Sequence, residues 1–204
     1  QLPLENVVYY GDTAHAPYGT KPPEVVMARV RQVMAELLNR NVKAVVIACN
    51  TATSVAAATL RAEMTLPIIG MEPALKPAHQ LRHGGQVLVM ATPLTLRLPK
   101  FAALMADCAG SCTIFKCPCP ELVEFVERGE LTGTALENVL RRELAGVLSP
   151  APDAVVLGCT HFPFLKCAIN AVFGKEMHFF DGAEGTAKET RRRLELAGLR
   201  TAQT

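Results

Sequence analysis

Three features of the sequence predict an α/β fold with parallel sheets, divided into two similar halves. Short apolar runs alternate with longer segments of helical periodicity, which is the order of strands and helices in parallel sheets. One run occurs twice, because residues 44–49 and residues 154–159 are both apolar and both end in a cysteine. Gly84 and Gly85 mark a break between the copies. We therefore expect two α/β halves that join near residues 71–85.

The first half begins with an apolar segment, residues 4–10, that predicts a strand. The turn-rich residues 12–23 follow it. A helix is expected over residues 24–39, where apolar side chains recur at helical spacing. Residues 42–48 are apolar without alternation, which is typical of a parallel strand buried on both faces. A helix of small residues at 51–64 and a short strand at 67–70 complete this half.

The second half continues the alternation. Residues 73–83 predict a connecting helix, residues 86–91 a strand, and residues 154–158 the second buried strand. The other expected elements are helices at residues 93–106, 121–128, 134–148, 163–173 and 186–197 and strands at residues 113–116 and 178–180.

The composition bounds the class of protein. With 204 residues, half of them hydrophobic, the chain can bury a sizeable core without disulfides or metal ions to stabilise it. A net charge of +2 predicts neither a nucleic-acid nor a membrane partner, and no apolar run reaches the ~18 residues of a membrane-spanning helix. The seven cysteines are irregularly spaced, which favours cytosolic thiols over a disulfide framework and predicts a cytoplasmic protein.

The repeated cysteines are the strongest candidates for chemistry. Ligands of parallel α/β sheets bind beyond the carboxyl ends of the strands, where both Cys49 and Cys159 are expected, each before a helix. A helix N-terminus lowers a thiol pKa, and its N–H groups, with Asn50, Thr51 and Thr160, suit a carboxylate. Two equivalent thiols facing one ligand fit a reaction that runs in both directions at one carbon. The alternative is that both are small buried hydrophobes.

Other polar residues are weaker candidates. His161 lies two positions after Cys159 and could exchange a proton with it, although a histidine can also satisfy a local backbone group. The loop at residues 12–19 ends the first expected strand, and it is either a site loop or a plain turn. Glutamates on one face of the helix after residue 120 are usually solvated, although one could reach a cleft; they are Glu121, Glu124 and Glu127.

Neither a metal nor an organic cofactor is predicted. Four cysteines fall within twelve positions, but their spacings of three, four and one residues lack paired CxxC motifs; they are Cys108, Cys112, Cys117 and Cys119. We interpret them as loop and core residues. The sequence also has no GxGxxG, no Walker loop and no setting for a Schiff-base lysine, so no nucleotide or pyridoxal cofactor is implied.

The motifs resemble those of the cofactor-independent racemases of the aspartate/glutamate racemase superfamily, and within it the glutamate racemases. The resemblance runs from the first residues to about residue 195, and the Cys-Asn-Thr and Cys-Thr-His pair is its most specific part. A Pro-Tyr-Gly loop at residues 17–19 favours glutamate over aspartate. The matching segments are Gly11-Asp12-Thr13-Ala14, Pro17-Tyr18-Gly19, Ala48-Cys49-Asn50-Thr51-Ala52 and Gly158-Cys159-Thr160-His161, with weaker matches at Glu72-Pro73-Ala74, Cys119-Pro120, Glu127 with Gly129, and Asp181-Gly182-Ala183.

The resemblance implies a function. Cys49 and Cys159 would be the acid/base thiols, with His161 and Glu127 as further catalytic residues. The implied substrate contacts are Tyr18, Gly19, Asn50, Thr51, Thr160 and His161. The chain would interconvert L- and D-glutamate without a cofactor and supply D-glutamate for peptidoglycan. An aspartate racemase, another isomerase of the superfamily, and a non-catalytic binding or regulatory protein derived from a racemase remain alternatives.

The resemblance also implies an architecture. Two similar α/β domains would enclose the active site in the cleft between them, the first formed by residues 1–76 and 184–204 and the second by residues 77–183. The expected partner is the small-molecule substrate, and a homodimer is compatible with the sequence.

One family feature has no match. The family begins with a strand ending in Asp-Ser-Gly, which supplies an aspartate beside the first thiol and a serine that contacts substrate. This chain begins with Gln1, where the first helix of the family would end, and Asp12 belongs to the Gly-Asp-Thr-Ala motif. We expect either a fragment or a shortened form of the protein. Without that strand, the first sheet would lack a central member and activity would be in doubt.

Overall fold

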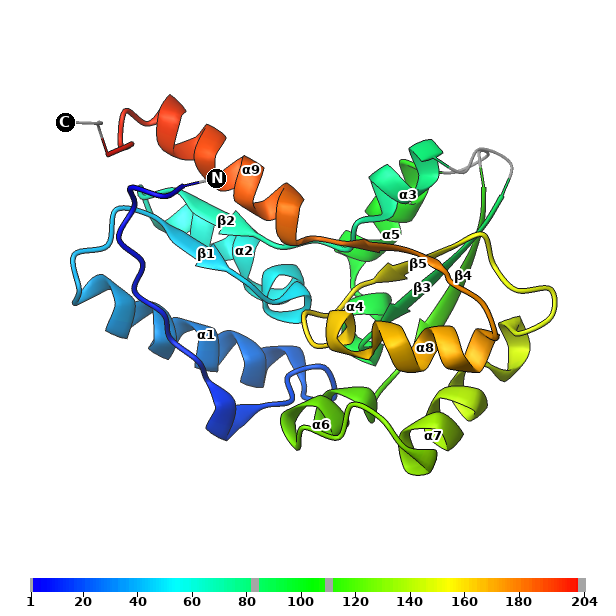
Figure 1. Ribbon diagram of the computed structural model, residues 1–204. Coiled ribbons are helices and arrows are strands. Elements are labelled where there is room, and N and C mark those ends of the chain that lie inside the picture. Colours follow the sequence, from blue (N-terminus) through cyan, green and yellow to red (C-terminus); the bar gives the residue numbers. More distant parts are fainter. Residues whose placement is uncertain (1, 82–84, 109–111, 202–204) are drawn as a thin grey trace. The chain divides into compact units, whose positions relative to one another are not determined.

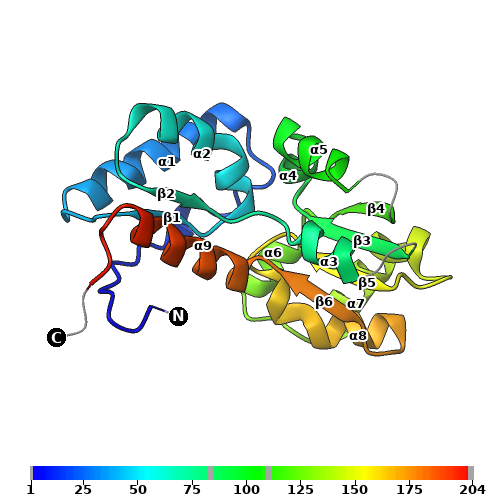
Figure 2. The same ribbon diagram turned by 90° about the horizontal axis from the view of Figure 1, so that it is seen from above.

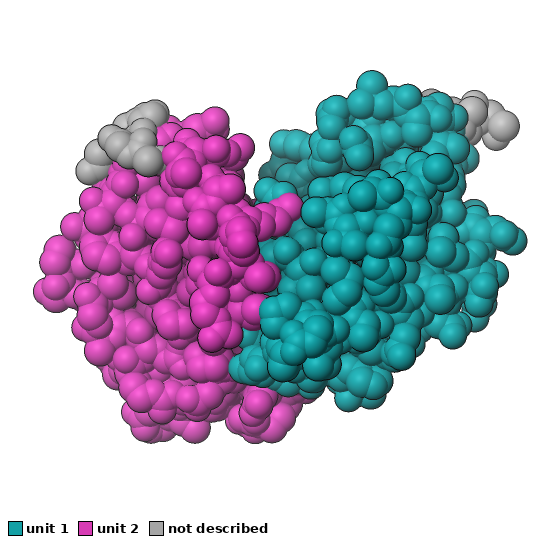
Figure 3. Space-filling view, turned by 180° about the vertical axis from the view of Figure 1, so that it is seen from behind, with its two compact units in different colours: residues 1–72, 183–204 teal, residues 73–182 magenta. Residues whose placement is uncertain are grey.

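The computed structural model describes residues 2–81, 85–108 and 112–201, and it divides into two compact units (Figure 3). Unit 1 holds the residues up to Glu72 together with those from Ala183 onward, and unit 2 holds residues 73–182. The domain limits expected from the sequence assign residues 73–76 and 183 to the opposite units. As limits of folding domains they stay a prediction.

Unit 1 contains a parallel two-stranded sheet whose strand β2 (Ile68–Gly70) has a helix against each face. β1 (Val45–Ile47) pairs with β2, so that Ile47 lies opposite Gly70. Helix α2 (Asn50–Glu63) connects the strands and covers one face, and α9 (Ala183–Leu196) lies against the other (Figure 2). Helix α1 (Pro23–Leu38) packs on α2 (Figure 1). A single 3₁₀ turn, Thr13–His15, precedes α1.

Two predictions for unit 1 are wrong. Residues 4–10 form no strand, and Val7 and Tyr9 are 83% and 86% exposed. An apolar run becomes a strand only where a neighbouring strand pairs with it, and no described residue pairs with this segment. The strand over residues 42–48 shortens to β1 and is not buried on both faces, because Val46 is 41% exposed.

Unit 2 is a fuller α/β layer structure. Its sheet has the strand order β4-β3-β5-β6, and every pairing is parallel. The strands are β3 (Gln86–Ala91), β4 (Thr113–Pro118), β5 (Ala154–Leu157) and β6 (His178–Asp181). The helices are α3 (Leu75–Leu81), α4 (Pro93–Arg97), α5 (Pro99–Ala106), α6 (Leu122–Glu127), α7 (Thr134–Leu144) and α8 (Lys166–Phe173), with 3₁₀ turns at Ala145–Val147 and Phe162–Leu165.

Alternate residues of the central strands feed two separate cores. Leu88 and Met90 of β3 pack toward α6, α7 and α8, whereas Val87 and Val89 pack toward α3 and α5. All four residues of β5 are buried, as predicted for a central parallel strand. The sheet of unit 2 is therefore covered on both faces, and parallel α/β architecture is confirmed for the chain.

Most element boundaries follow local chemistry. The helix expected over residues 93–106 is broken at Leu98, because the residue before Pro99 must be extended. Gly174 ends α8 in the left-handed conformation. The connecting helix expected to reach residue 83 is described as far as Leu81, and its last two positions lie outside the described residues.

In the part of the chain that the structure describes, no helix is long and apolar enough to cross a membrane.

Candidate active site

Cys49 lies at the junction of β1 and α2 in unit 1. It is the N-cap residue of α2, and its Sγ accepts a hydrogen bond from the N–H of Ala52 at 3.5 Å. Asn50 and Thr51 form the first turn of this helix, and each is only 3% exposed. The side-chain oxygen of Asn50 has no hydrogen-bond partner among the described residues. A thiol and a buried acceptor therefore occupy the same helix N-terminus.

The helix N-terminus acts to lower the pKa of Cys49, as expected, but it does not decide the net direction. Burial raises the pKa of the Cys49 thiol, although hydrogen bonds from the N–H groups of Ala52 and Thr51 act in the opposite direction. Desolvation of the thiolate outweighs the helix terminus.

A buried threonine fixes the turn that carries Cys49. The Thr53 hydroxyl donates to the carbonyl of Ile47 at 3.1 Å and accepts from the N–H of Met71 at 3.0 Å. Gly70 packs directly against this side chain, since a Cβ added to it would lie 2.4 Å from Thr53 Cγ2. Thr53 therefore ties the ends of β1 and β2 to the first turn of α2.

The loop at residues 12–19 is organised by Asp12. Arg29 of α1 donates to both Asp12 oxygens at 2.7 Å, and the Tyr18 hydroxyl donates a short hydrogen bond to Oδ2. The Arg29 guanidinium holds the pKa of Asp12 well below its usual range. Burial and the hydrogen bond to Asp12 raise the pKa of Tyr18, whose surroundings include Cys49. Tyr18 is therefore a neutral hydroxyl held in one orientation, and Gly19 beside it is buried.

Cys159 lies at the end of β5 in unit 2 and is 8% exposed. The preceding Gly158 approaches β3 closely: its N–H donates to Met90 O at 2.7 Å, and an added Cβ would lie 2.9 Å from Ala91 Cβ. The helix expected over residues 163–173 begins as α8 only at Lys166, because a 3₁₀ turn at Phe162–Leu165 precedes it. The second thiol therefore lacks the α-helical N-terminus that the first one caps.

A histidine and a carboxylate accompany Cys159. Its Sγ lies 3.6 Å from Nδ1 of His161, and Nε2 of His161 lies 2.6 Å from Oε1 of Glu127. Glu127 is the last residue of α6, and its side chain is 40% exposed. Although Glu127 is far from Cys159 and His161 in the sequence, the three side chains form a continuous thiol–imidazole–carboxylate chain. A proton can move along this chain.

The predicted site residues thus form one group in each unit. Unit 1 brings Tyr18 into the electrostatic surroundings of Cys49, which Asn50 and Thr51 follow directly. In unit 2, His161 lies beside Cys159, and Glu127 lies beside His161. Thr160 is between Cys159 and His161 in the sequence. The roles of these residues in binding and catalysis stay predictions.

Arg29 was missed by the sequence analysis. It lies in the middle of an amphipathic helix, where an arginine is most often solvated, and only the fold brings it to Asp12. A cation with no acidic neighbour at helical spacing gives at most a weak hint of such a contact.

The four cysteines between residues 108 and 119 do not converge on one site. Cys108 packs in the core beneath α3 and α5, and Cys112 lies 3.9 Å from Nδ1 of His79 on the same side of the sheet. Cys117 and Cys119 belong to the core on the opposite face. Because the four cysteines lie on two opposite faces of the sheet, they cannot surround one zinc ion.

Thiols after parallel strands, one of them beside an imidazole and a carboxylate, are groups that can carry protons to and from a substrate. The sequence profile of the Asp/Glu/Hydantoin racemase family matches residues 2–190, and the chain belongs to this family.

Its relatives include a glutamate racemase from Clostridium perfringens, which is 46% identical over 195 residues covering 95% of this chain and 75% of the relative. The structure of glutamate racemase from Francisella tularensis in complex with D-glutamate is similar, with a TM-score of 0.83, 27% identity and coverage of 100% of this chain and 76% of that one. The structure of Escherichia coli glutamate racemase with L-glutamate and an activator has a TM-score of 0.79 and 33% identity, covering 88% of this chain and 68% of that one.

Proposed function

We propose that this chain is a glutamate racemase that interconverts L- and D-glutamate by proton transfer at Cα between two cysteines. The observation that carries the proposal is the pair of thiols at matching strand ends, in a chain 46% identical to a glutamate racemase. The substrate assignment is supported by similar glutamate racemases whose structures contain D-glutamate in one case and L-glutamate in another.

The two thiols would alternate as base and acid. In one direction Cys159 gives its proton to His161, removes the Cα proton as a thiolate, and Cys49 delivers its own proton to the opposite face. In the other direction the roles reverse. The different surroundings of the thiols support this assignment, because burial raises the pKa of the Cys49 thiol whereas Cys159 has an imidazole at 3.6 Å.

The polar groups beside Cys49 would hold the amino acid. The N-terminus of α2 and the Thr51 hydroxyl carry donors that suit a carboxylate, although the N–H groups of Ala52 and Thr51 also hydrogen-bond to the Cys49 sulfur. The buried side-chain oxygen of Asn50 is an acceptor, which suits the α-ammonium group. Thr160 in unit 2 and the Tyr18 hydroxyl in unit 1 would provide further substrate contacts.

Stabilisation of the carbanion is the main demand on this site. The Cα–H of an amino acid is a very weak acid, and general acid–base transfer supplies only about 10²–10⁴-fold. Preorganised donors and exclusion of water must supply the rest. A neutral Cys49 thiol would serve here, because a proton already positioned on the opposite face can be delivered as the carbanion forms.

Isotope exchange tests the mechanism. In D₂O, L-glutamate should gain deuterium at Cα as it racemises, and Cys49→Ala and Cys159→Ala should each lower kcat by about 10²–10⁴ or more, since each removes an acid/base group. Cys167→Ala, which changes an exposed cysteine, is the matched control and should retain activity. Undiminished turnover in either thiol variant would exclude a two-base mechanism.

Substrate identity needs its own test. Polarimetry with glutamate, aspartate and other small acids separates glutamate racemase from aspartate racemase and from other isomerases of the superfamily. Binding of glutamate without deuterium incorporation would instead identify a non-catalytic protein derived from a racemase.

The wider setting is part of the same proposal. D-glutamate made in the cytoplasm would supply peptidoglycan precursors, and a homodimer would be the assembly. Sedimentation of the purified chain across a concentration series measures the assembly directly, and a mass that stays monomeric throughout would remove that part of the proposal.

A further inference from the structure

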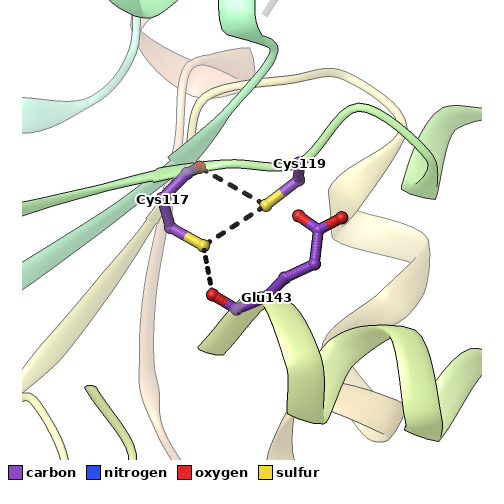
Figure 4. A group of neighbouring side chains, drawn as sticks. All are labelled: Cys117, Cys119 and Glu143. Atoms are coloured by element: carbon purple, nitrogen blue, oxygen red, sulfur yellow. Dashed lines mark hydrogen bonds between the residues drawn. The ribbon is translucent and has the colours of Figure 1, made fainter. Parts of the chain in front are cut away.

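Three potential metal ligands meet at the end of β4, apart from the thiols of the proposed active site. Cys117 lies on β4, Cys119 follows the strand, and Glu143 comes from the last turn of α7 (Figure 4). The two sulfur atoms are 3.6 Å apart, and one ligand atom from each residue lies within 4.8 Å of the others. This is the only such group among the residues that the structure describes.

The two thiols are buried, Glu143 is partly buried, and one of its carboxylate oxygens has no hydrogen-bond partner among the described residues. Cys117 and Cys119 are 4% and 0% exposed, and the Glu143 side chain is 6% exposed. The Glu143 carboxyl lies beside the Cys119 sulfur (Figure 4), yet its Oε2 atom has no hydrogen-bond partner among the described residues. The other carboxylate oxygen, Oε1, forms an ion pair with Arg142 at 3.7 Å. A buried carboxylate oxygen without a partner is rare and calls for a cation or a proton.

The sulfur spacing fits a single bound ion. Two thiolates at the usual Zn–S distance of about 2.3 Å in a tetrahedral site are roughly 3.8 Å apart. The observed separation of 3.6 Å is close to this value and far from the length of about 2.05 Å of a disulfide. Two thiolates and a carboxylate are also a ligand set that Zn²⁺ accepts.

We propose that Cys117, Cys119 and Glu143 bind a zinc-like divalent ion, with the fourth position open to water. At present the Cys117 thiol donates to the Glu143 carbonyl at 3.3 Å and the Cys119 thiol to the Cys117 carbonyl at 3.4 Å. An ion would replace these thiol protons, which are released to solvent on binding.

Binding would join β4 to α7 at the point where the chain turns toward α6. Cys119 is three residues before the start of α6, and that helix ends at Glu127, the carboxylate that contacts His161. The ion is therefore a structural element that would stiffen the base of α6, and it takes no part in the proposed proton transfer.

Metal binding should be measured on the full chain in a Cys49→Ala/Cys159→Ala background. That background removes the thiols of the proposed active site, so failure of racemisation and failure of metal binding are separate results. Reduced protein titrated with Co²⁺ should show thiolate-to-metal absorption, and dialysis against Zn²⁺ should leave one ion per chain. Zn²⁺ should also raise Tm, because an ion that binds only the folded state stabilises it.

Two ligand variants and one control decide the assignment. Loss of a residue that supports a ligand typically lowers metal affinity by about 10–100-fold, so Cys117→Ser and Glu143→Gln should each lower it by at least about tenfold. Cys167→Ser, at an exposed cysteine of the same unit, should leave affinity unchanged.

Several results would overturn the proposal. Unchanged Zn²⁺ affinity in either ligand variant would do so, as would the absence of both Co²⁺ absorption and a Tm shift in the parent background. Should Cys117→Ser fail to fold by circular dichroism, Glu143→Gln, which preserves side-chain size, carries the test alone.

Discussion

Cys49 and Cys159 occupy the same position after their strands but have different chemical surroundings. Cys49 caps an α-helix, and burial raises the pKa of its thiol. Cys159 instead contacts the His161 imidazole, which in turn contacts the Glu127 carboxylate. A base needs a route for its proton and an acid needs a proton in place, so the asymmetry suits a reaction in which both are required at once. The sequence repeat alone predicts two equivalent thiols. The structure shows that the residues around the two sulfur atoms differ.

The carboxylate behind His161 gives a prediction at the scale of one residue. Glu127→Gln keeps the side-chain size but removes the charge that stabilises a protonated His161, so kcat should fall by about 10–100-fold, within the range of acid–base effects, with a smaller change in KM. Glu124→Gln, on the same helix with a 60% exposed side chain, is the control and should leave the rate unchanged. Equal losses in both variants would indicate damage to α6 instead.

Sequence could identify site residues that neighbour the thiols and could not identify those brought in by packing. Asn50, Thr51, Thr160 and His161 follow a thiol directly, so the motif itself reveals them. Arg29 reaches Asp12 only because α1 packs beside the loop, and no local pattern encodes that distance. Glu143 joins Cys117 and Cys119 from a separate helix for the same reason.

At the scale of elements, two glycines allow close approach beside the candidate thiols. Gly70 lies against Thr53 below the turn of Cys49, and Gly158 lies against β3 directly before Cys159. Neither glycine is required by a left-handed backbone; each is required by the lack of space for a Cβ. The positions of both thiols therefore depend on close packing of strand ends.

Gly70→Ala tests this packing in unit 1. Its added methyl would lie 2.4 Å from Thr53 Cγ2, and overpacking of this kind lowers the free energy of unfolding by about 1–3 kcal/mol. Urea denaturation measures the change. The double variant Gly70→Ala/Thr53→Ser removes the clashing methyl but keeps the hydroxyl, so it should recover most of the loss. Gly185→Ala, on α9 with no neighbour within 4 Å of the added atom, should lose nothing. No rescue by Thr53→Ser would contradict the steric explanation.

The elements were predictable where local sequence decides them. β3 is observed over the predicted residues 86–91, since its apolar run is bounded by clear turn signals. The strand at residues 4–10 failed because strand formation depends on a partner, which composition does not specify. The helix after Cys159 was placed too early, because an apolar run containing Pro163 is compatible with a 3₁₀ turn as well as with an α-helix.

At the scale of the whole chain, a partly buried carboxylate joins residues far apart in sequence within unit 1. Glu5 lies 2.6 Å from the Lys43 amine and accepts hydrogen bonds from Thr201 N at 2.9 Å and Oγ1 at 2.8 Å. The hydrogen bond with Lys43, followed by those from Thr201, lowers the pKa of Glu5 from 4.5 to about 2. Both terminal regions of the chain are thereby held to the loop that precedes β1.

This contact predicts an acid-dependent loss of stability. Because the folded-state pKa of Glu5 is lowered, its contribution is fully present above about pH 4.5 and is lost as the pH falls toward 2. Glu5→Gln should therefore lower Tm at neutral pH and flatten the decline of Tm between these values. Glu24→Gln, at an exposed position, is the control and should keep the parental slope. An unchanged slope in Glu5→Gln would show that other carboxylates govern acid unfolding.

The exposed strand of unit 1 bears on how the protein behaves in concentrated solution. Within the described residues β1 pairs only with β2, and Val46, at its middle, is 41% exposed. Backbone groups along an unpaired strand edge bind other extended chains, and an apolar residue there strengthens the attachment. We therefore expect self-association of the purified chain through the open edge of β1 at high protein concentration, which light scattering across a concentration series measures.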